Sequence, residues 1–295
     1  MLKLISVLLA YAAFFVVSPS VTVDGKHYRG HQLKERILEE NSYDWHYANS
    51  TVALSALAYC GNETIMSGNY NNSIFITDFA PTSLVYNKYY DVNGFIGTSK
   101  ADQSIYVIFR GSMTITNWLD DFETLMTNYP LCHQCLVHAG FYYSALSVKD
   151  DVVASVQYLQ KMYPDYSVVV AGHSLGGALA TLTAVNLITN DITKIRHFSF
   201  GSPRLANEAA SSFISKLLPE IYRTTHYKDI VPHNPFVHFG YVHVSGEWYE
   251  NENGLLNICM GPEDPRCADQ WTFAENIVDH MKYLGRDMWC NLGNP

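Results

Sequence analysis

The chain has 295 residues, of which 48% are hydrophobic and 14% aromatic, and its formal net charge is −9. This length and apolar content suffice for one large buried core, or for two small ones. The modest negative charge and the lack of a basic cluster argue against nucleic acid as a partner.

The first twenty residues have the pattern of a secretory signal peptide. Lys3 gives a positive start, residues 4–17 are apolar except for Ser6, and residues 18–20 offer small side chains for cleavage. The apolar run is short for a bilayer span, which makes an uncleaved anchor the weaker alternative. We therefore expect residues 1–20 to be a signal peptide and the protein to be secreted.

Six cysteines follow the leader, an even number that suits an oxidising compartment. They are Cys60, Cys132, Cys135, Cys259, Cys267 and Cys290. The residues alone leave their pairing open, but the single Cys-x-x-Cys favours a structural disulfide over redox chemistry or zinc binding. Three Asn-x-Ser/Thr triplets also fit a secreted glycoprotein, at Asn49, Asn62 and Asn71.

The rest of the chain predicts an α/β fold. Residues 21–45 are polar and charged, and we expect an arm or propeptide there. No repeat or linker divides residues 46–295, which we expect to form one domain. Hairpin-like strand patterns come first, and helices then alternate with short apolar strands, which predicts a mostly parallel central sheet covered by helices on both faces. The expected helices span 45–60, 141–163, 175–188 and 206–217, and the strands 73–80, 83–90, 94–99, 104–112, 166–172, 194–203 and 220–232.

The stretch Gly172-His173-Ser174-Leu175-Gly176 lies between an apolar strand pattern and a helix pattern. A Gly-x-Ser-x-Gly sequence in this position is typical of a nucleophile elbow, in which the serine has a strained backbone and larger side chains at the glycines would collide with neighbouring backbone. The helix directs its N-terminal N–H groups at the site, so the Leu175 N–H can bind an oxyanion. A simple turn is the alternative for Ser174.

A serine nucleophile needs a base and an acid that orients the base, and on this fold they follow in the order acid, then histidine. Asp229 follows an apolar strand and precedes a Pro-rich loop, as expected for the acid. The base candidates are His233, His238, His243 and His280. The first three crowd close behind Asp229, which favours structural roles, whereas the position of His280 near the C-terminus favours it as the base.

The ordered motifs "VIFRGSMTITNW", "VHAGF", "VVVAGHSLGGALA", "FSFGSPRLAN", "THYKDIVP", "GYVHVSGEWY" and "DHMKYLG" resemble those of secreted class 3 lipases of the filamentous-fungus type. The resemblance covers about residues 46–290. It implies an α/β-hydrolase-type fold, with Ser174 as nucleophile, Asp229 as acid and His280 as base. It also implies that Ser112 is the second oxyanion donor, a role that typically contributes about 3 to 4 kcal/mol to transition-state stabilisation.

The resemblance implies three disulfides, Cys60–Cys290, Cys132–Cys135 and Cys259–Cys267. The remaining polar residues of the motifs receive structural roles. We expect Arg110 to be a partly buried cation that pairs with an acid, and His138 and His173 to pack or form hydrogen bonds.

The segment between Ser112 and Cys132 predicts a short amphipathic helix, with Ile115, Trp118, Leu119, Phe122, Leu125 and Met126 on its apolar face. An ordinary surface helix is one alternative, but its place beside an oxyanion donor and its "TNW" resemble a lipase lid. Burying such a face contributes roughly 7 to 15 kcal/mol, so the lid would open most readily against lipid. We expect interfacial activation on triacylglycerol, with a lipid ester at an oil–water or membrane interface as the partner.

Other functions stay open. The cysteine pattern also fits the related feruloyl esterase branch, although the apolar lid argues against it, and phospholipase A1 activity is possible on the same fold. A secreted lipid- or glycan-binding protein with a dead site is the non-enzyme alternative, but no triad residue is missing. We expect no cofactor and no metal, because this chemistry needs neither. We also expect a monomer without an obligate protein partner.

Overall fold

A computed structural model describes residues 21–23, 26–28, 43–70, 78–115, 124–218, 220–271 and 276–290. The chain divides into two compact units, residues 1–42 and 43–295. Within the first unit, β1 (Val21–Val23) and β2 (Lys26–Tyr28) form an antiparallel pair. The expected signal peptide lies outside the described residues. None of the described helices is both long and apolar enough to cross a membrane.

The second unit is built on an eight-stranded sheet with the order β12-β11-β10-β9-β8-β5-β4-β3. Five neighbouring strands run parallel, from β5 to β11, and antiparallel strands complete both edges. The strands are β3 (Ala80–Asn87), β4 (Val92–Ser99), β5 (Ser104–Phe109), β8 (Ser167–His173), β9 (Ile195–Phe200), β10 (Ile221–His226), β11 (Glu247–Glu250) and β12 (Leu256–Ile258). The prediction of a mostly parallel central sheet is therefore confirmed.

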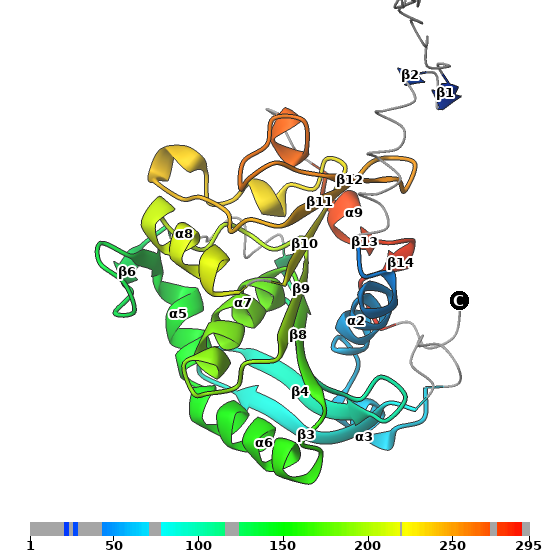
Figure 1. Ribbon diagram of the computed structural model, residues 1–295, viewed down its shortest axis with the longest axis vertical. Helices are drawn as coiled ribbons and strands as arrows, with labels where there is room; N and C mark the ends of the chain where they lie inside the picture. The colour runs from blue at the N-terminus through cyan, green and yellow to red at the C-terminus, as the bar shows by residue number, and fades with distance from the viewer. Residues whose placement is uncertain are drawn as a thin grey trace, which may run out of the picture. The chain divides into compact units, whose positions relative to one another are not determined.

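Helices cover both faces of this sheet (Figure 1). On one face lie α5 (Ala139–Leu146), α6 (Lys149–Met162), α7 (Leu175–Ile188) and α8 (Glu208–Leu217), which share one apolar core with the sheet. On the other face α2 (Trp45–Leu57) packs with the C-terminal segment in a second core. The β-strands of the centre are apolar on both sides for this reason, as β5 and β8 illustrate.

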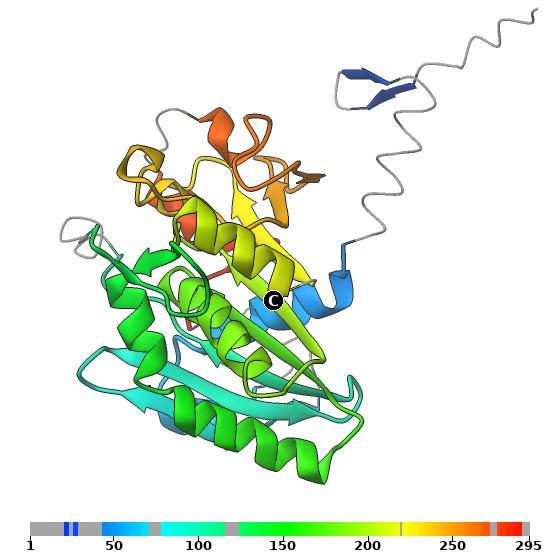
Figure 2. The same cartoon turned by 60° about the vertical axis from the view of Figure 1, so that its left-hand side comes forward.

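The helix expected over residues 141–163 is in fact two helices, α5 and α6, which end and begin around Ser147 and Val148. Val148 is buried in the core, so the apolar repeat continues across the break and conceals it. Asp150 and Asp151 in the first turn of α6 favour a new helix start there, because acids stabilise helix N-termini. Figure 2 shows α6 running along the β3–β4 hairpin.

The shorter elements frame the end of the sheet where β8 and β10 terminate. They are β6 (Met126–Asn128), β7 (Leu136–His138), α9 (Ile277–His280), β13 (Lys282–Tyr283) and β14 (Arg286–Asp287), whereas α3 (Asn62–Ser67) packs against β3. The second unit begins at Tyr43, three residues before the expected boundary. Its buried side chain donates or accepts a hydrogen bond of 2.8 Å with Thr224, and Asp44 caps α2.

All six cysteines are paired as the family resemblance implies. The structure joins Cys60 to Cys290, Cys132 to Cys135, and Cys259 to Cys267. The first bond connects residues 230 positions apart, and it ties the end of α2 to the segment that follows α9 and β14. A loop of this length loses much chain entropy in the unfolded state when it is closed.

Candidate active site

Ser174 lies between β8 and α7 with a backbone φ of 58° and ψ of −131°. Few residues other than glycine adopt a positive φ, so this serine is held in a strained conformation. Its N–H donates to the Phe200 carbonyl at 2.9 Å, which fixes the turn against β9. The side chain is buried, and its Oγ has no hydrogen-bond partner within the described part of the chain. It therefore does not cap α7, and its oxygen is available for chemistry.

The two glycines around Ser174 allow this turn to pack closely. A Cβ at Gly172 would lie 2.3 Å from the Gly176 carbonyl oxygen, and one at Gly176 would lie 2.4 Å from the Phe109 carbonyl oxygen. A real Cβ atom does not approach a backbone oxygen this closely. The collision predicted for larger side chains at these positions is confirmed, and the strand–serine–helix arrangement is that of a nucleophile elbow.

Asp229 and His280 meet from segments 51 residues apart. The Nδ1 of His280 lies 2.8 Å from Oδ2 of Asp229, and both side chains are buried. Oδ1 of Asp229 accepts from the Val231 N–H at 2.8 Å, and the Tyr283 hydroxyl donates to Oδ2. Because a carboxylate accepts, Nδ1 of His280 carries the proton. Its Nε2 has no partner among the described residues and is left as a proton acceptor.

Gly201 and Gly111 bring the nucleophile and the pair together. Gly201 follows Phe200, whose carbonyl binds the Ser174 N–H. A Cβ at Gly201 would lie 2.8 Å from Oδ2 of Asp229 and 3.0 Å from Cε1 of His280. A Cβ at Gly111 would lie 2.8 Å from the Cβ of Ser174. Ser112, the residue after Gly111, therefore follows the backbone segment that touches the nucleophile.

Two backbone segments near Ser174 could stabilise an oxyanion. Leu175 is the first residue of α7, and because Ser174 does not cap this helix, the dipole and free N–H groups of its first turn face the site. Ser112 is partly exposed and follows Gly111, whose backbone approaches the Cβ of Ser174 after the end of β5. A hydroxyl, an imidazole, an oriented carboxylate and nearby N–H donors are the groups that acyl transfer requires.

The model of the family described as Lipase (class 3) matches residues 106–239. The lipase of Rhizomucor miehei is 32% identical over 203 residues, which are 66% of this chain and 56% of that protein. The crystal structure of the lipase from Rhizopus microsporus var. chinensis has a TM-score of 0.74 at 30% identity, over 88% of this chain and 89% of that one. This chain belongs to the class 3 lipase family.

A further solved structure is similar over 92% of this class 3 lipase chain and 98% of its own, with a TM-score of 0.75 and 26% identity. It is a triacylglycerol lipase whose catalytic centre is described as a serine protease triad. The fold is thus that of the α/β-hydrolases. The chain spans little more than half the length of the curated relatives it matches. The family match includes Ser174 and Asp229 and ends before His280.

The other histidines of this class 3 lipase have structural contacts. His173 Nε2 lies 2.8 Å from the His280 carbonyl oxygen, and its Nδ1 lies 2.7 Å from the Tyr59 hydroxyl. Burial, and next the charge of His280, hold the pKa of His173 well below its usual value. His243 binds the Pro232 carbonyl at 2.7 Å. His138 caps α5 by accepting from the Phe141 N–H. The expected packing and hydrogen-bonding roles of His138 and His173 are confirmed.

Arg110 has the role expected of a partly buried cation. Its Nη2 pairs with Asp91 at 3.1 Å, and its Nε donates to the Gly111 carbonyl at the same distance. Arg110 therefore fixes the backbone that leads to Ser112.

The expected lid falls mainly outside the described residues. Trp118, Leu119 and Phe122 lie there, and of the four lid residues only Ile115 is described, as partly buried. The apolar helical face was expected to continue through Leu125 and Met126, and this is wrong. Leu125 is 64% exposed outside any helix, and Met126 begins the strand β6 that pairs with β7.

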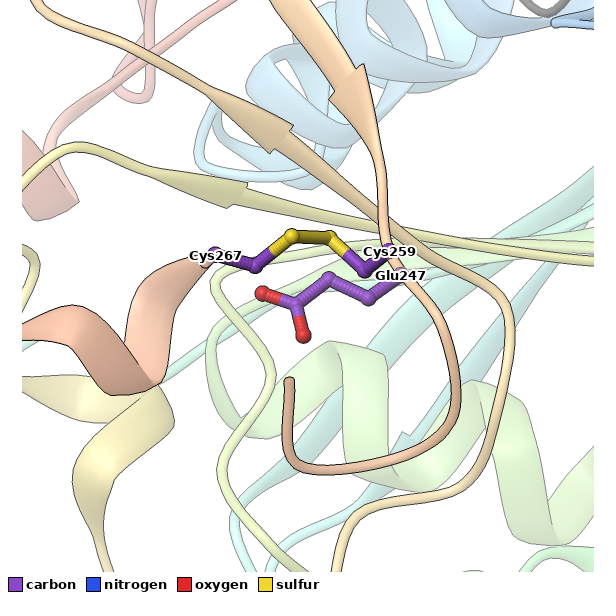
Figure 3. A group of neighbouring side chains, drawn as sticks. All are labelled: Glu247, Cys259 and Cys267. Atoms are coloured by element: carbon purple, nitrogen blue, oxygen red, sulfur yellow. A yellow bond between two sulfur atoms is a disulfide. The ribbon is translucent and has the colours of Figure 1, made fainter. Parts of the chain in front are cut away.

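Among the described residues, Glu247, Cys259 and Cys267 are the one group close enough to hold a metal ion. Figure 3 shows that the two sulfur atoms are bonded to each other beside the Glu247 carboxylate. Disulfide sulfurs are not thiolates and do not ligate metals as cysteines do. Glu247 is occupied by Arg223, Thr225 and the Ala268 N–H, so this group is structural.

Sequence reasoning did not identify Tyr283, Gly201 or Tyr59 as part of the site. Tyr283 was visible as the tyrosine of "DHMKYLG", three residues after His280, but nothing local indicated its acceptor. Gly201 directly follows β9, just as Ser174 directly follows β8. This shared position at the end of a strand was the signal in the sequence that could have identified Gly201.

Proposed function

We propose that this chain is a secreted serine carboxylester hydrolase, specifically a triacylglycerol lipase that acts through Ser174, His280 and Asp229. One observation carries the proposal. Within the described residues, a strained, buried serine has an Oγ without a hydrogen-bond partner, and its N–H binds Phe200. The next residue, Gly201, adjoins a buried histidine whose Nδ1 is bound to a carboxylate and whose Nε2 has no partner there. The three disulfides support an extracellular location, and we propose a monomer.

The reaction follows from the protons that these atoms can hold. His280 Nε2 accepts the Ser174 proton as Oγ attacks the ester carbonyl carbon, and the new charge on the carbonyl oxygen is stabilised by the N–H groups of Ser112 and Leu175. His280 then gives its proton to the leaving alcohol, which leaves an acyl-serine. Water, activated by the same Nε2, hydrolyses the acyl-serine and restores both groups. Asp229 stabilises the imidazolium throughout through its bond to Nδ1.

The exposed surface supports a lipid ester as the substrate. Large apolar side chains project from the segments that carry Ser112, Asp229 and His280 and from the end of the expected lid. They are Met113 after Ser112, Leu125 at the end of the expected lid, Phe236, Val237 and Phe239 after Asp229, and Val278 before His280, and each is 47% to 71% exposed. The Tyr241 hydroxyl bonds the Thr124 carbonyl, so the Asp229 loop adjoins the lid segment. Exposed apolar groups around a site indicate contact with another apolar phase.

The same surface supports interfacial activation. Apolar side chains that would be exposed to water when the lid opens are transferred into lipid when it opens at an interface, which shifts the population toward the open state. Hydrolysis should rise where the substrate exceeds its solubility limit. A hyperbolic dependence with no rise at that concentration would contradict lid control.

A feruloyl esterase is the second candidate, because the Cys132–Cys135 and Cys259–Cys267 disulfides fit that branch of the family.

Hydrolysis of emulsified triacylglycerol, phosphatidylcholine and methyl ferulate by the purified protein separates the candidates, with Ser174→Ala as the control. We expect the triacylglycerol to be the best substrate. Strong ferulate turnover with negligible triacylglycerol turnover would reverse the assignment. A preference for phosphatidylcholine would indicate a phospholipase. No covalent labelling of Ser174 by an organophosphonate would indicate a binding protein.

A further inference from the structure

A chain of contacts that begins at the Tyr59 hydroxyl reaches three segments of the proposed site, at Gly111, His173 and His280. Tyr59 follows α2 and precedes Cys60, whose disulfide anchors it to Cys290. Its hydroxyl lies 2.7 Å from His173 Nδ1. It also packs against the Gly111 backbone, because a Cβ at Gly111 would lie 2.4 Å from it.

The protons along this chain of bonds have a fixed direction. The His280 carbonyl can only accept, so the 2.8 Å contact requires a proton on His173 Nε2. His173 is neutral, because burial depresses its pKa, so its Nδ1 has no proton and accepts from Tyr59. Burial raises the pKa of Tyr59, which keeps that donor proton in place. Tyr59 therefore donates to His173 and His173 donates to the backbone of His280, while the Tyr59 hydroxyl packs against Gly111.

We propose that Tyr59 and His173 are positioning residues that hold the segment before Ser112 and the backbone of His280 in register around Ser174. Neither side chain reaches the reacting atoms in this scheme. The inference rests on the proposed function of Ser174, Ser112 and His280. It adds that α2, which contributes no group to the chemistry, sets the relative position of the oxyanion donor and the base.

The loss of the Tyr59 hydroxyl has a definite consequence. His173 Nδ1 is buried and would then lack a donor, so the ring is no longer restricted to the Nε2–H tautomer. The other tautomer directs a lone pair of Nε2 at the His280 carbonyl oxygen, and the two repel. His280 would move relative to Ser174, and a displacement of about 1 Å at a reacting group costs about 10²-fold in rate.

The test compares Tyr59→Phe with Tyr47→Phe. Tyr47 lies on α2, the helix that Tyr59 follows, and its hydroxyl contacts Ser104 at 2.9 Å and the Asp102 carbonyl at 3.2 Å, away from the site. On a soluble short-chain ester, Tyr59→Phe should lower kcat about 10- to 100-fold and leave KM unchanged. Tyr47→Phe should keep the activity of the unchanged protein. Equal kcat values for the two variants would overturn the proposal.

His173 variants test the direction of the bonds, and they serve even if Tyr59→Phe does not fold. The amide of His173→Gln has one donor and one acceptor, as neutral His173 does, whereas His173→Leu has neither. We expect His173→Gln to retain at least tenfold more kcat than His173→Leu. Adding Tyr59→Phe to His173→Leu should cause little further loss, because members of one chain are not additive. Equal activity of the two His173 variants, or fully additive losses, would contradict the chain.

A spectroscopic measurement separates this inference from the proposed function. The proton on His280 Nδ1, bound to Asp229, should give a downfield NMR signal that His280→Gln removes. Tyr59→Phe should shift or broaden this signal, and Tyr47→Phe should not. A protein that hydrolyses no ester but shows this shift would refute the proposed function and keep the positioning chain. A signal unchanged in Tyr59→Phe would refute the chain whatever the activity.

Discussion

Two buried polar clusters lie in this protein, and they use their hydrogen bonds differently. The site cluster comprises Ser174, Asp229, His280 and Tyr283, and the ion-pair cluster comprises Arg204, Arg223, Glu247 and Glu263. In the ion-pair cluster each carboxylate is bound by a guanidinium, at 2.8 Å in both pairs, and by backbone N–H groups. Arg204 also binds Asp269 at 2.9 Å, so each guanidinium there has at least one carboxylate partner.

In the site cluster the Asp229 carboxylate is equally well bound. The imidazole ring of its partner His280, however, makes no second hydrogen bond among the described residues. Within the part of the chain that the structure describes, Oγ of Ser174 and Nε2 of His280 are buried without hydrogen-bond partners. Among the described residues the ion-pair cluster also has unpartnered nitrogens, on Arg223 and the nearby His233, but the hydroxyl that adjoins this cluster, that of Thr225, is bound to Glu247. Reactivity therefore depends on which atoms lack a hydrogen-bond partner, and not on burial or charge alone.

The two carboxylates can be changed in the same way, with opposite expected results. Asp229→Asn keeps the shape of the side chain but removes the charge that orients His280, and the expected loss in kcat is about 10⁴-fold. Esterase assays measure this loss, and urea unfolding serves as the stability control. A loss below tenfold would mean that Asp229 is not the orienting acid.

Glu247→Gln should do the reverse. It leaves the buried guanidinium of Arg223 without a counter-charge, and breaking such a buried pair costs about 3 to 5 kcal/mol of unfolding free energy. Activity per folded molecule should be unchanged, because Glu247 has no contact with the site cluster. Urea unfolding gives the stability, and active-site titration gives the folded fraction. A large fall in kcat at unchanged stability would erase the distinction between the clusters.

Gly201→Ala should crowd the site cluster and leave the ion-pair cluster unchanged. Gly201 has a φ of +59°, and the added methyl would lie 2.7 Å from the Tyr283 hydroxyl and 2.8 Å from Oδ2 of Asp229. We expect an activity loss of about 10²-fold from displaced groups. Gly285→Ala is the matched control, because its φ is +73° and nothing lies within 4 Å. It should share the backbone strain of about 1 to 2 kcal/mol and keep its activity.

The ion-pair cluster should also make stability dependent on pH through His233. Burial, and next the charge of Arg204, lower the pKa of His233 to about 4. The unfolded chain, with a histidine pKa near 6.5, binds more protons between these values, so stability falls as the pH drops from about 6.5 to 4. His233→Phe should lose about 2 kcal/mol less over this range, as urea unfolding at pH 7 and pH 4 would measure. Parallel curves for both proteins would contradict this assignment.

Local patterns in the sequence were enough for the elements around Ser174. The apolar run of β8, the two glycines and the helix over 175–188 are consecutive, so their order alone predicts the turn. Asp229 and His280 could be chosen from chain order and the family resemblance. The break between α5 and α6 could not be predicted, because Val148 at the break is apolar and buried and therefore fits the pattern of one continuous helix.

Contacts between distant segments could not be found in this way. Tyr59, Gly201 and Tyr283 gain their roles only when α2, β9 and β13 lie side by side, and each looks locally like an ordinary tyrosine or turn glycine. The ion pairs of Arg204 with Glu263 and of Arg223 with Glu247 are hidden for the same reason.

The four residues proposed to act on the ester stand at positions 112, 174, 229 and 280, and the Cys60–Cys290 bond encloses them all. No short fragment contains the whole constellation, and most of the sheet must be paired before its parts meet. During refolding, hydrolysis should therefore return only with the last long-range pairings, later than the helical signal in circular dichroism. Enzyme turnover would then report on completion of the native topology rather than on early collapse.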